Sequence, residues 1–326
     1  MCGIYGSTIA YNDETVREKM GRISVRGPDY TGIQRYDKVV FAHNRLAIID
    51  LDPRSNQPFT YLHLHIVFNG EIYNYKDIRK DLERKNYQFR TSSDTEVICA
   101  AYLAYGADCL NRFNGMFAFV IYDSLKNELF GARDRFGKKP FYYAHDHGDF
   151  EFASQPSQIS IHRDLNVDEK AIDQYLIWGY VPEPQSIFAE VKQLPAAHYF
   201  TYQIESSKLK TTEYWTLDYG WKNKFAGSYD EAKEALELIL ADAVKIRMNA
   251  DVPLGVFLSG GIDSSLIAAM ATKEIDHVKT FSIKFNEKGF DESAYAKQVA
   301  QHLGTDHHTI ECNYNDGIEL IENFNQ

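Results

Sequence analysis

The sequence predicts an α+β domain followed by an α/β domain, and three observations support this prediction. The chain has 326 residues, enough for about two domains, and 44% of them are apolar, which is ample for two buried cores. The first half alternates short β-branched and aromatic runs with turn residues. After a polar stretch at residues 204–227, the pattern changes to helical spacing and then to a strand, loop, helix and strand.

Strands of the first half are predicted where β-branched and aromatic residues cluster between Gly, Pro, Asn and Asp turns. These runs are 4–9, 39–42, 66–68, 117–122 and 150–153. Two helices are expected between them, at 75–85 and from Ser93 to residue 105. Ser93 and Glu96 match a Ser-x-x-Glu capping box at the start of the second helix. The helices are therefore expected to cover the faces of the strands.

The second half opens with a helix expected from Ser228 to about residue 248, because Ser228 and Glu231 match another capping box. A buried strand, a Gly-rich turn, a helix and a second strand are expected to follow at 254–258, 259–263, 264–271 and 280–285. A right-handed crossover makes the two strands parallel and places the turn at the carboxyl edge of the sheet, where α/β folds bind ligands.

Charge and cysteine content exclude several classes of partner. The formal charge is 35 − 46 = −11, whereas nucleic-acid binding rests on clustered Lys and Arg. The sequence contains no apolar run of about 20 residues and no signal peptide at its start. Its four cysteines, Cys2, Cys99, Cys109 and Cys312, are too scattered for a disulfide framework or a CxxC metal site. We therefore expect a cytoplasmic protein that binds neither nucleic acid nor membranes.

Cys2 is the first candidate for chemistry. If the initiator methionine is removed, the thiol stands on the N-terminal residue, so that one residue carries both a nucleophile and a base. The α-amine has a pKa of about 8 and can accept the thiol proton near neutral pH. The alternative is a small apolar residue that packs at the start of a strand.

Five segments resemble the class II glutamine amidotransferase domain in order and spacing. They are MCGIYG (1–6), RGPD (26–29), RLAIID (45–50), NGEIYN (69–74) and SSDTE (92–96). Together with ARDRFGKKPFYY (132–143) and VPLGVFLSGGIDSS (252–265), their forms are similar to glutamine-hydrolysing asparagine synthetase. The resemblance implies an N-terminal-nucleophile αββα sandwich over 2–215. It also implies the N-terminal part of a PP-loop domain, of the adenine nucleotide alpha hydrolase type, over 228–326.

The resemblance also implies roles for residues of the first domain. Cys2 would attack the glutamine side chain, and the Asn69 amide with the Gly70 backbone N–H would form the oxyanion hole. Arg45 would bind the α-carboxylate, and Asp94, assisted by Glu71, the α-ammonium. The remaining residues expected to line the pocket are Leu46, Ala47, Ile48 and Ile49.

Read from the residues alone, each of these polar positions has an alternative. Asn69 and Gly70 are also typical of a hairpin turn, and Arg45 of a surface ion pair. Asp94 would equally be a helix-cap carboxylate. Arg26 would order the site or line an ammonia passage, or else belong to a structural turn that ends at Pro28.

The segment SGGIDSS lies at a strand-to-helix turn, where backbone N–H groups form an anion-binding nest. It lacks the Gly-Lys-Ser/Thr ending of a Walker A loop and resembles the PP-loop of ATP pyrophosphatases, whereas a mere helix start is the alternative. The resemblance implies that Asp263 holds the Mg²⁺ that bridges the ATP phosphates. The other residues implied in ATP binding are Leu258, Ser259, Gly260, Gly261, Ser264, Ser265 and Ile283.

The family resemblance predicts ATP-dependent asparagine synthesis, with glutamine, aspartate and ATP as the ligands. Synthetases of this family continue into an SGxGxDE segment and a later lysine, neither of which follows Gln326, so we expect a fragment of a longer protein, with a natural truncation as the alternative. Two other functions stay open, an amidotransferase that acts on a sugar carboxylate or forms a β-lactam ring, and a non-catalytic glutamine sensor. The sequence leaves the oligomeric state open, with a homodimer among the options.

Overall fold

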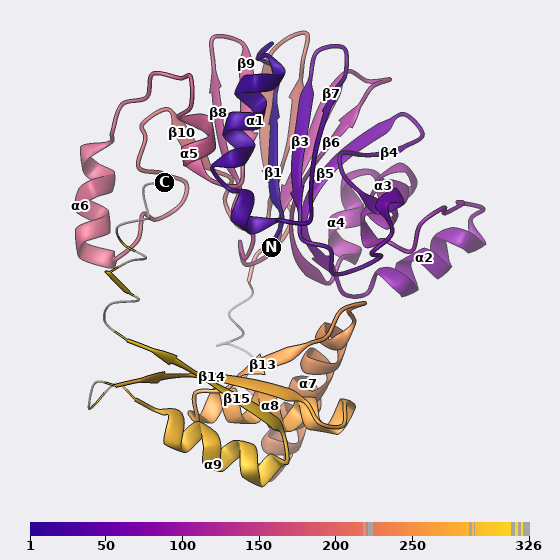
Figure 1. Cartoon of the computed structure of the whole chain (residues 1–326). Helices are drawn as coiled ribbons and strands as arrows, with labels where there is room; N and C mark the ends of the chain where they lie inside the picture. The colour runs from indigo at the N-terminus through magenta and orange to yellow at the C-terminus, as the bar shows by residue number, and fades with distance from the viewer. Residues whose placement is uncertain are drawn as a thin grey trace. The chain divides into compact units, whose positions relative to one another are not determined.

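The computed structural model describes residues 1–217, 220, 224–286, 289, 291–313, 317, 318 and 321. The chain divides into two compact units, residues 1–219 and residues 220–326 (Figure 1). The predicted domains, 2–215 and 228–326, fall one in each unit. The two units are described separately.

Two six-stranded antiparallel sheets form the first unit. The first sheet has the order β10-β8-β9-β1-β3-β2. Its strands are β1 (Gly3–Ser7), β2 (Tyr30–Arg35), β3 (Val40–Arg45), β8 (Tyr142–Asp146), β9 (Asp149–Ala153) and β10 (Val191–Gln193). The second sheet has the order β12-β11-β7-β6-β5-β4. Its strands are β4 (Phe59–Tyr61), β5 (Leu64–Ile72), β6 (Gly115–Asp123), β7 (Glu128–Arg133), β11 (His198–Gln203) and β12 (Lys208–Glu213).

Side-chain alternation along the strands builds three apolar layers. Ile4 packs between the two sheets, whereas its neighbour Tyr5 packs against the helices that cover the first sheet. On the second sheet, Val67 packs between the sheets and Phe68 packs against helices. The predicted αββα order is therefore confirmed, with helices on the two outer faces (Figure 1). The helices of this unit are α1 (Asp13–Gly21), α2 (Tyr75–Arg84), α3 (Asp94–Tyr105), α4 (Cys109–Arg112), α5 (Pro156–Ile159) and α6 (Glu169–Trp178).

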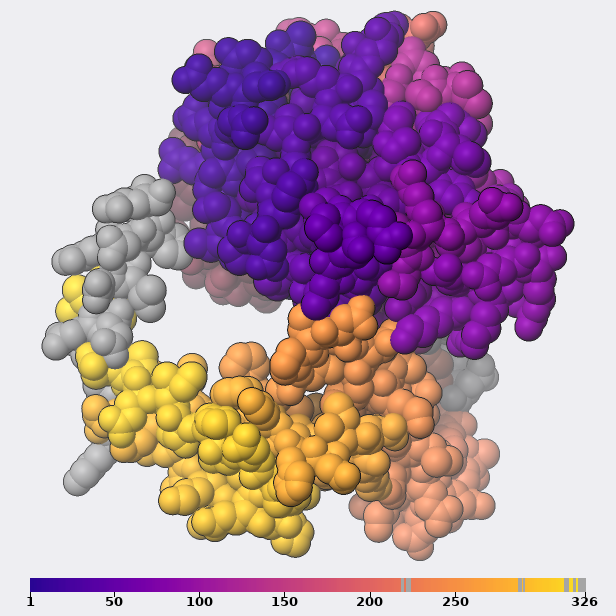
Figure 2. All heavy atoms as spheres, turned by 45° about the vertical axis from the view of Figure 1, so that its right-hand side comes forward, coloured from indigo at the N-terminus to yellow at the C-terminus, as the bar shows by residue number. Residues whose placement is uncertain are grey.

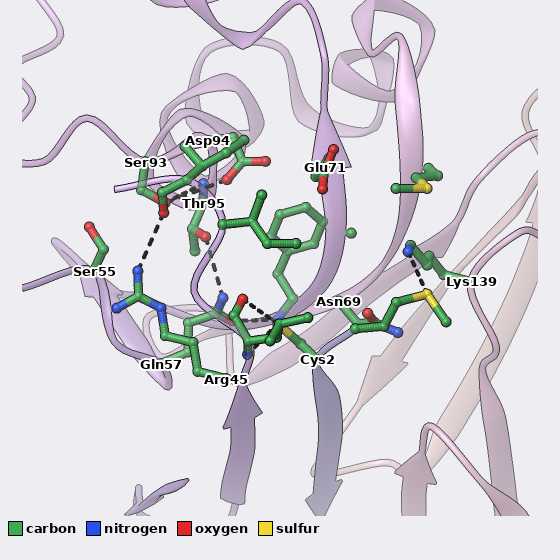
Figure 3. A pocket seen from close by; sticks show the side chains of 17 residues that line it. Cys2, Arg45, Ser55, Gln57, Asn69, Glu71, Ser93, Asp94, Thr95 and Lys139 are labelled. Carbon is green, nitrogen blue, oxygen red and sulfur yellow. Dashed lines mark hydrogen bonds between the residues drawn. The ribbon is translucent and has the colours of Figure 1, made fainter. Parts of the chain in front are cut away.

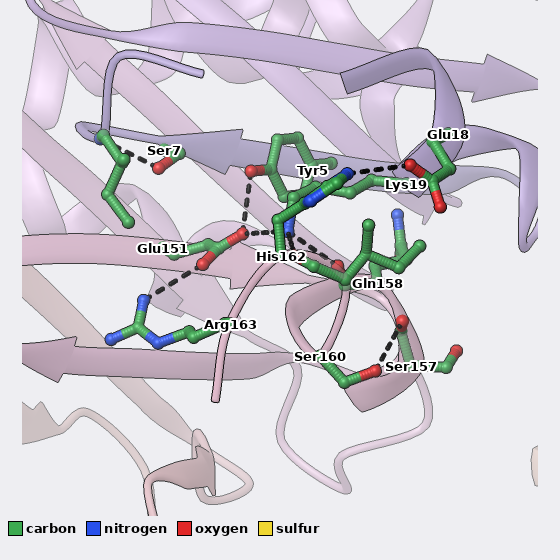
Figure 4. A network of polar contacts seen from close by, with 12 residues as sticks. Tyr5, Ser7, Glu18, Lys19, Glu151, Ser157, Gln158, Ser160, His162 and Arg163 are labelled. Carbon is green, nitrogen blue, oxygen red and sulfur yellow. Dashed lines mark hydrogen bonds and ion pairs between the residues drawn. The ribbon is translucent and has the colours of Figure 1, made fainter. Parts of the chain in front are cut away.

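A buried ion pair ties α1 to the first sheet (Figure 4). Lys19 Nζ lies 3.0 Å from Glu151 Oε1, and both side chains are fully buried. The same ammonium donates to the carbonyls of Gln158, within α5, at 3.0 Å and of Ile161, just after α5, at 2.5 Å. Arg163 also pairs with Glu151, at 3.1 Å. Every charge of this network thus has a partner, which offsets the desolvation of buried ions.

The second unit contains a three-stranded parallel sheet in the order β13-β14-β15. The strands are β13 (Gly255–Phe257), β14 (Lys279–Phe285) and β15 (Asp306–Cys312), and the helices are α7 (Tyr229–Lys245), α8 (Ile262–Glu274) and α9 (Ser293–Leu303). In the space-filling view these elements are coloured from orange to yellow (Figure 2). The predicted parallel pairing and the Ser228 capping box are both confirmed.

Three local expectations differ from the structure. Ser93 does cap α3, but the Glu96 carboxylate accepts the backbone N–H groups of Arg90 and Thr91 instead of closing a capping box. The polar stretch at 204–227 is not wholly a junction, because β12 pairs with β11 and forms the edge of the second sheet. The run at 254–258 is not a buried strand, since β13 is an edge strand and the Phe257 side chain is exposed.

Two kinds of feature are absent from the residues that the structure describes. No helix there is long and apolar enough to cross a membrane. The same residues include no group of three or more His, Cys, Asp or Glu side chains placed to hold a metal ion.

Loss of the Lys19 ammonium should destabilise the first unit strongly. Lys19→Met keeps the length of the side chain but leaves Glu151 with one cation fewer in a buried site. We expect the free energy of unfolding to fall by about 3 kcal/mol, measured by urea denaturation.

Lys38→Met is the control, because Lys38 forms an exposed ion pair with Glu205 at 3.7 Å. That substitution should cost less than about 1 kcal/mol. Equal losses for the two variants would contradict a stabilising role for the buried network.

Candidate active site

A cavity of about 250 Å³ lies where β1 begins and β3 ends, beside the C-terminal half of β5 (Figure 3). In this view Cys2 and Asn69 lie between Arg45 and Lys139. The residues that line the cavity are Met1, Cys2, Arg45, Leu46, Ile48, Ile49, Ser55, Gln57, Phe68, Asn69, Gly70, Glu71, Ser93, Asp94, Thr95, Met116 and Lys139. Most of the first-domain residues predicted from the sequence are thus brought together.

Cys2 is placed by the pairing of β1 with β3, in which Gly3 lies opposite Asn44. Its thiol therefore meets the residue that follows β3, and Leu46 N–H donates to the sulfur at 3.4 Å while the thiol is 3.6 Å from the Leu46 carbonyl. Burial raises the pKa of the Cys2 thiol, whereas the Leu46 N–H opposes this by stabilising the thiolate. A half-buried thiol with a backbone donor on its sulfur is suited to act as a nucleophile.

The RGPD segment (26–29) forms hydrogen bonds with the backbone on both sides of the contact between Cys2 and Leu46. Arg26 Nε donates to the Cys2 carbonyl at 3.2 Å, and Arg26 Nη2 is buried without a hydrogen-bond partner. The Asp29 carboxylate accepts the Ala47 N–H at 2.8 Å, and the Asp29 N–H donates to the Arg45 carbonyl at 3.0 Å. The segment therefore orders the backbone on both sides of the thiol.

Arg45 is buried and is not the surface ion pair that its sequence also allowed. Its guanidinium donates to the carbonyl of Asp52 at 3.2 Å, to that of Asp50, and to Asn56 Oδ1 at 2.6 Å. Among the ion pairs of the described residues, none includes Arg45. Loop carbonyls thus fix the guanidinium while its charge is left for an anionic ligand.

Asn69 offers an amide donor without a partner. It lies within β5, paired with Ala118, so the hairpin-turn alternative is wrong. The side chain is buried, and its Nδ2 has no hydrogen-bond partner among the residues that the structure describes. An unsatisfied buried donor is costly, which is typical of a position whose acceptor arrives with the ligand.

Two side chains hold the backbone next to Asn69. Gln57 Oε1 accepts the Phe68 N–H at 2.6 Å, and His43 Nε2 lies 3.0 Å from the Phe68 carbonyl. Burial lowers the pKa of His43 to about 3, so the ring is neutral and donates from Nε2. Since backbone groups alternate along a strand, the Gly70 N–H points to the same side as that of Phe68, away from β6.

Gly70 is required by the sheet itself. A Cβ at this position would lie 2.2 Å from the Met116 carbonyl and 2.7 Å from Phe117 Cα, both on β6. A side chain at position 70 is therefore excluded by the close packing of β5 against β6, whether or not a ligand also approaches this backbone.

Asp94 supplies a buried carboxylate at the first residue of α3. Its Oδ2 accepts the Ile72 N–H at 3.0 Å. Burial, with the nearby charge of Glu71, raises the pKa of Asp94 to about 7. A cationic group in this part of the cavity would favour the ionised carboxylate, so the site is suited to an ammonium ligand.

The predicted lining residues are placed unequally. Leu46, Ile48 and Ile49 line the cavity, whereas Ala47, whose N–H donates to Asp29, is not among its lining residues. Gln57 and Lys139 were missed by sequence reasoning. For Lys139 a signal existed in the segment ARDRFGKKPFYY, but nothing in that segment indicated which of its two lysines is buried.

In the second unit, a cavity of about 340 Å³ lies at the carboxyl end of β13 and β14. Of the residues expected to bind ATP, Leu258, Ser259, Ser264 and Ile283 line it, whereas Gly260, Gly261, Asp263 and Ser265 are not among its lining residues. Ser264 Oγ accepts the Ser259 N–H at 3.2 Å and lies 3.0 Å from Ser259 Oγ. The two hydroxyls are thus gathered at the start of α8.

Two glycines shape this turn differently. Gly260 has a φ of +85°, and a Cβ there would lie 2.6 Å from the Ala296 nitrogen on α9. Gly261 has no such conflict, since its Cβ would meet only Ser259 Oγ, at 3.4 Å. The turn therefore needs a glycine at 260 to pass close to α9.

Family models match both parts of the chain. The glutamine amidotransferase domain model matches residues 1–215, and the asparagine synthase model matches residues 235–325. A Methanocaldococcus jannaschii protein provisionally named glutamine-hydrolysing asparagine synthetase 2 is 36% identical over 99% of this chain and 67% of its own length. Bacillus subtilis glutamine-hydrolysing asparagine synthetase 1 is 36% identical over 93% of this chain and 49% of its own length. The chain thus spans between about half and two thirds of these relatives.

A solved structure shares the fold at low sequence identity. The glutamine phosphoribosylpyrophosphate amidotransferase of B. subtilis, complexed with ADP and GMP, matches with a TM-score of 0.51 and 15% identity. The match covers 94% of this chain and 65% of that chain. The N-terminal-nucleophile sandwich predicted for the first unit is therefore confirmed.

Asp94 should make the stability of the protein depend on pH. Its ordinary pKa is 3.8 and burial raises it to about 7, so the folded state holds the proton more tightly than the unfolded state. Its contribution is thus complete below about pH 4, is lost as the pH rises to about 7, and is constant above. In the parent protein, we expect the free energy of unfolding to fall by an amount on the order of 2–4 kcal/mol between pH 5 and pH 8 because Asp94 loses its proton. Asp94→Asn should abolish this fall, as measured by urea denaturation at both pH values.

Asp77→Asn is the matched control, because Asp77 lies in the first turn of α2 with its side chain 81% exposed. That variant should keep the pH dependence of the parent protein. If Asp94→Asn keeps it as well, Asp94 is not the group responsible.

Proposed function

Because this chain belongs to the family of glutamine-hydrolysing asparagine synthetases, we propose that its first unit hydrolyses glutamine to glutamate and ammonia, with Cys2 as the nucleophile. The observation that carries the proposal is the unpartnered Asn69 Nδ2 in the same cavity as a thiol. A tetrahedral intermediate at the thiol would supply the oxyanion that this donor lacks.

The charges of the cavity support free glutamine as the substrate. Its α-carboxylate would bind the Arg45 guanidinium, and its α-ammonium would bind Asp94 with Glu71. A bound ammonium would also draw the proton from Asp94, since an adjacent cation lowers a carboxyl pKa. Leu46, Ile48 and Ile49 would pack against the methylene groups of the substrate.

The proposed reaction proceeds through a thioester. Once Met1 is removed, the α-amine of Cys2 takes the thiol proton, and the sulfur attacks the side-chain carbonyl carbon of glutamine. Asn69 Nδ2 and the Gly70 N–H donate to the resulting oxyanion. The proton then passes to the amide nitrogen, the C–N bond breaks and ammonia leaves. Water attacks the thioester and releases glutamate and the thiol.

For the second unit we propose ATP binding in the cavity at β13 and β14. Ser259, Ser264 and the backbone of the turn would bind the phosphates. The Mg²⁺ that accompanies ATP is compatible with the single carboxylate of Asp263, because magnesium is commonly held by one or two carboxylates and the substrate phosphates. Asp263 lies in the first turn of α8 and is exposed to such a ligand.

For the whole protein we propose the family reaction. The β-carboxylate of aspartate would attack the α-phosphate of ATP and release pyrophosphate, and ammonia would then displace AMP to give asparagine. The names of the relatives favour aspartate over a sugar carboxylate or a β-lactam precursor as the acceptor. The four free cysteines support a cytoplasmic location. A homodimer stays a prediction.

Replacing Cys2 or Asn69 should separate catalysis from binding. We expect Cys2→Ala to abolish glutamate release, and Asn69→Ala to lower kcat about 100-fold or more with a smaller change in KM, because the oxyanion exists only in the transition state. Glutamate is measured with protein whose intact mass shows that Met1 is absent.

Cys312→Ala is the control for the thiol, since Cys312 is the other half-buried cysteine and lies in the second unit. It should leave glutamate release unchanged. Activity that survives Cys2→Ala would exclude the proposed nucleophile, and a wild-type protein without turnover would favour a glutamine sensor.

Gly260→Ala should weaken ATP binding. A Cβ at this φ would push the turn away from α9, and a strain on the order of 1.4 kcal/mol corresponds to about tenfold weaker binding. We expect this change in the Kd of Mg·ATP by isothermal titration calorimetry. Glutamate release by the same protein is the control and should not change. An unaltered Kd would place the nucleotide elsewhere.

A further inference from the structure

The proposed reaction assigns no role to Lys139, although this lysine lines the glutamine cavity. It lies between β7 and β8 and is 3% exposed. Burial removes water from the charged ammonium, which is unfavourable. It therefore lowers the pKa of Lys139. Lysines are almost never this buried without a partner, so the position calls for an explanation.

The turn that carries Lys139 is fixed by a buried carboxylate. Asp134 accepts the N–H groups of Lys138 and Lys139, each at 3.0 Å, and that of Phe117 at 3.1 Å. Arg133 Nε donates to the Lys139 carbonyl at 2.8 Å. The backbone of Lys139 is therefore held on both sides, which limits where its ammonium can lie.

The ammonium itself has a poor partner. Across the described residues, its hydrogen bond is to Met1 Sδ, at 3.0 Å, and a thioether is a weak acceptor. The charged form is favoured by the nearby Glu71 carboxylate, by the Cys2 sulfur and by Asp134, and is disfavoured by Arg26. Removal of Met1 takes the thioether away, and the charged groups that remain around the ammonium include Cys2 and Glu71.

We propose that Lys139 is a positioning residue that holds the sulfur of Cys2 in its thiolate form and so sets the pH above which the nucleophile reacts. The inference rests on the proposed glutaminase function. The thiolate is the reactive form of cysteine, and an adjacent ammonium stabilises it. The other charged groups that act on the Cys2 sulfur include the α-amine of Met1 and Arg26, which have the same effect as Lys139, and Asp94, which opposes them.

The test is the pH dependence of Cys2 alkylation by iodoacetamide in protein without Met1. Lys139→Met keeps the length of the side chain and removes its charge. We expect the midpoint of the alkylation rate to rise by about one pH unit. At neutral pH, glutamate release should then fall about tenfold in kcat, because one unit of pKa changes the thiolate fraction about tenfold.

The neighbouring lysine provides a matched control. Lys138 is exposed and lies outside the cavity lining, so Lys138→Met should leave the midpoint and the turnover unchanged. Lys139→Arg keeps the charge and should keep the midpoint. Alkylation is quantified on the N-terminal peptide in a Cys312→Ser background, because Cys99 and Cys109 are buried.

An unchanged midpoint in folded Lys139→Met protein would overturn the proposal and leave Lys139 a structural role. If Lys139→Met does not fold, Lys139→Gln gives the same comparison. A shifted alkylation midpoint in Lys139→Arg, which keeps the charge, would also overturn the proposal. Wild-type protein that shows a Lys139-dependent midpoint but releases no glutamate would contradict the proposed function and support this inference.

Discussion

The contact between His43 on one sheet and the Phe68 carbonyl on the other is the constraint on which the site depends. The contact joins the two sheets at a distance of 3.0 Å. It lies just beyond the residues of β5 that pair with β4, where β5 pairs with β6 alone. Because Phe68 is held there, Asn69 faces the cavity from the second sheet while Cys2 faces it from the first. The proposed nucleophile and its proposed oxyanion donor therefore belong to different layers of the sandwich, and interlayer packing sets their separation.

The cavity concentrates charges that the protein itself does not neutralise. The Arg45 guanidinium is held by carbonyls, the Asp94 carboxylate by a backbone N–H, and the Lys139 backbone by Asp134. Each arrangement fixes the group without cancelling its charge, so that the cost of desolvation is carried by the surrounding packing. This contrasts with Lys19 and Glu151, where each charge meets an opposite charge. The difference separates a network that stabilises the fold from a cavity suited to a zwitterion.

Local patterns predicted several strands and helices of the first unit, whereas its αββα layers and most of the residues expected in the cavity came from the resemblance to a known family. Asn69 and Arg45 were ambiguous on their own, and only their tertiary positions exclude a turn and a surface ion pair. Glu96 satisfied the local pattern of a capping box, yet the Arg90 and Thr91 backbone competes for its carboxylate. Gln57 acts through Phe68, eleven residues away, and no periodicity reports such a contact.

The raised pKa of Asp94 links the occupancy of the cavity to the lifetime of the protein. With the cavity empty at neutral pH, the buried carboxylate weakens the folded state, and a bound ammonium removes that penalty. Proteases that cleave transiently opened chains would thus degrade the empty form faster. The cellular abundance of the protein would then rise and fall with the supply of the amino acid proposed as its ligand, without any change in gene expression.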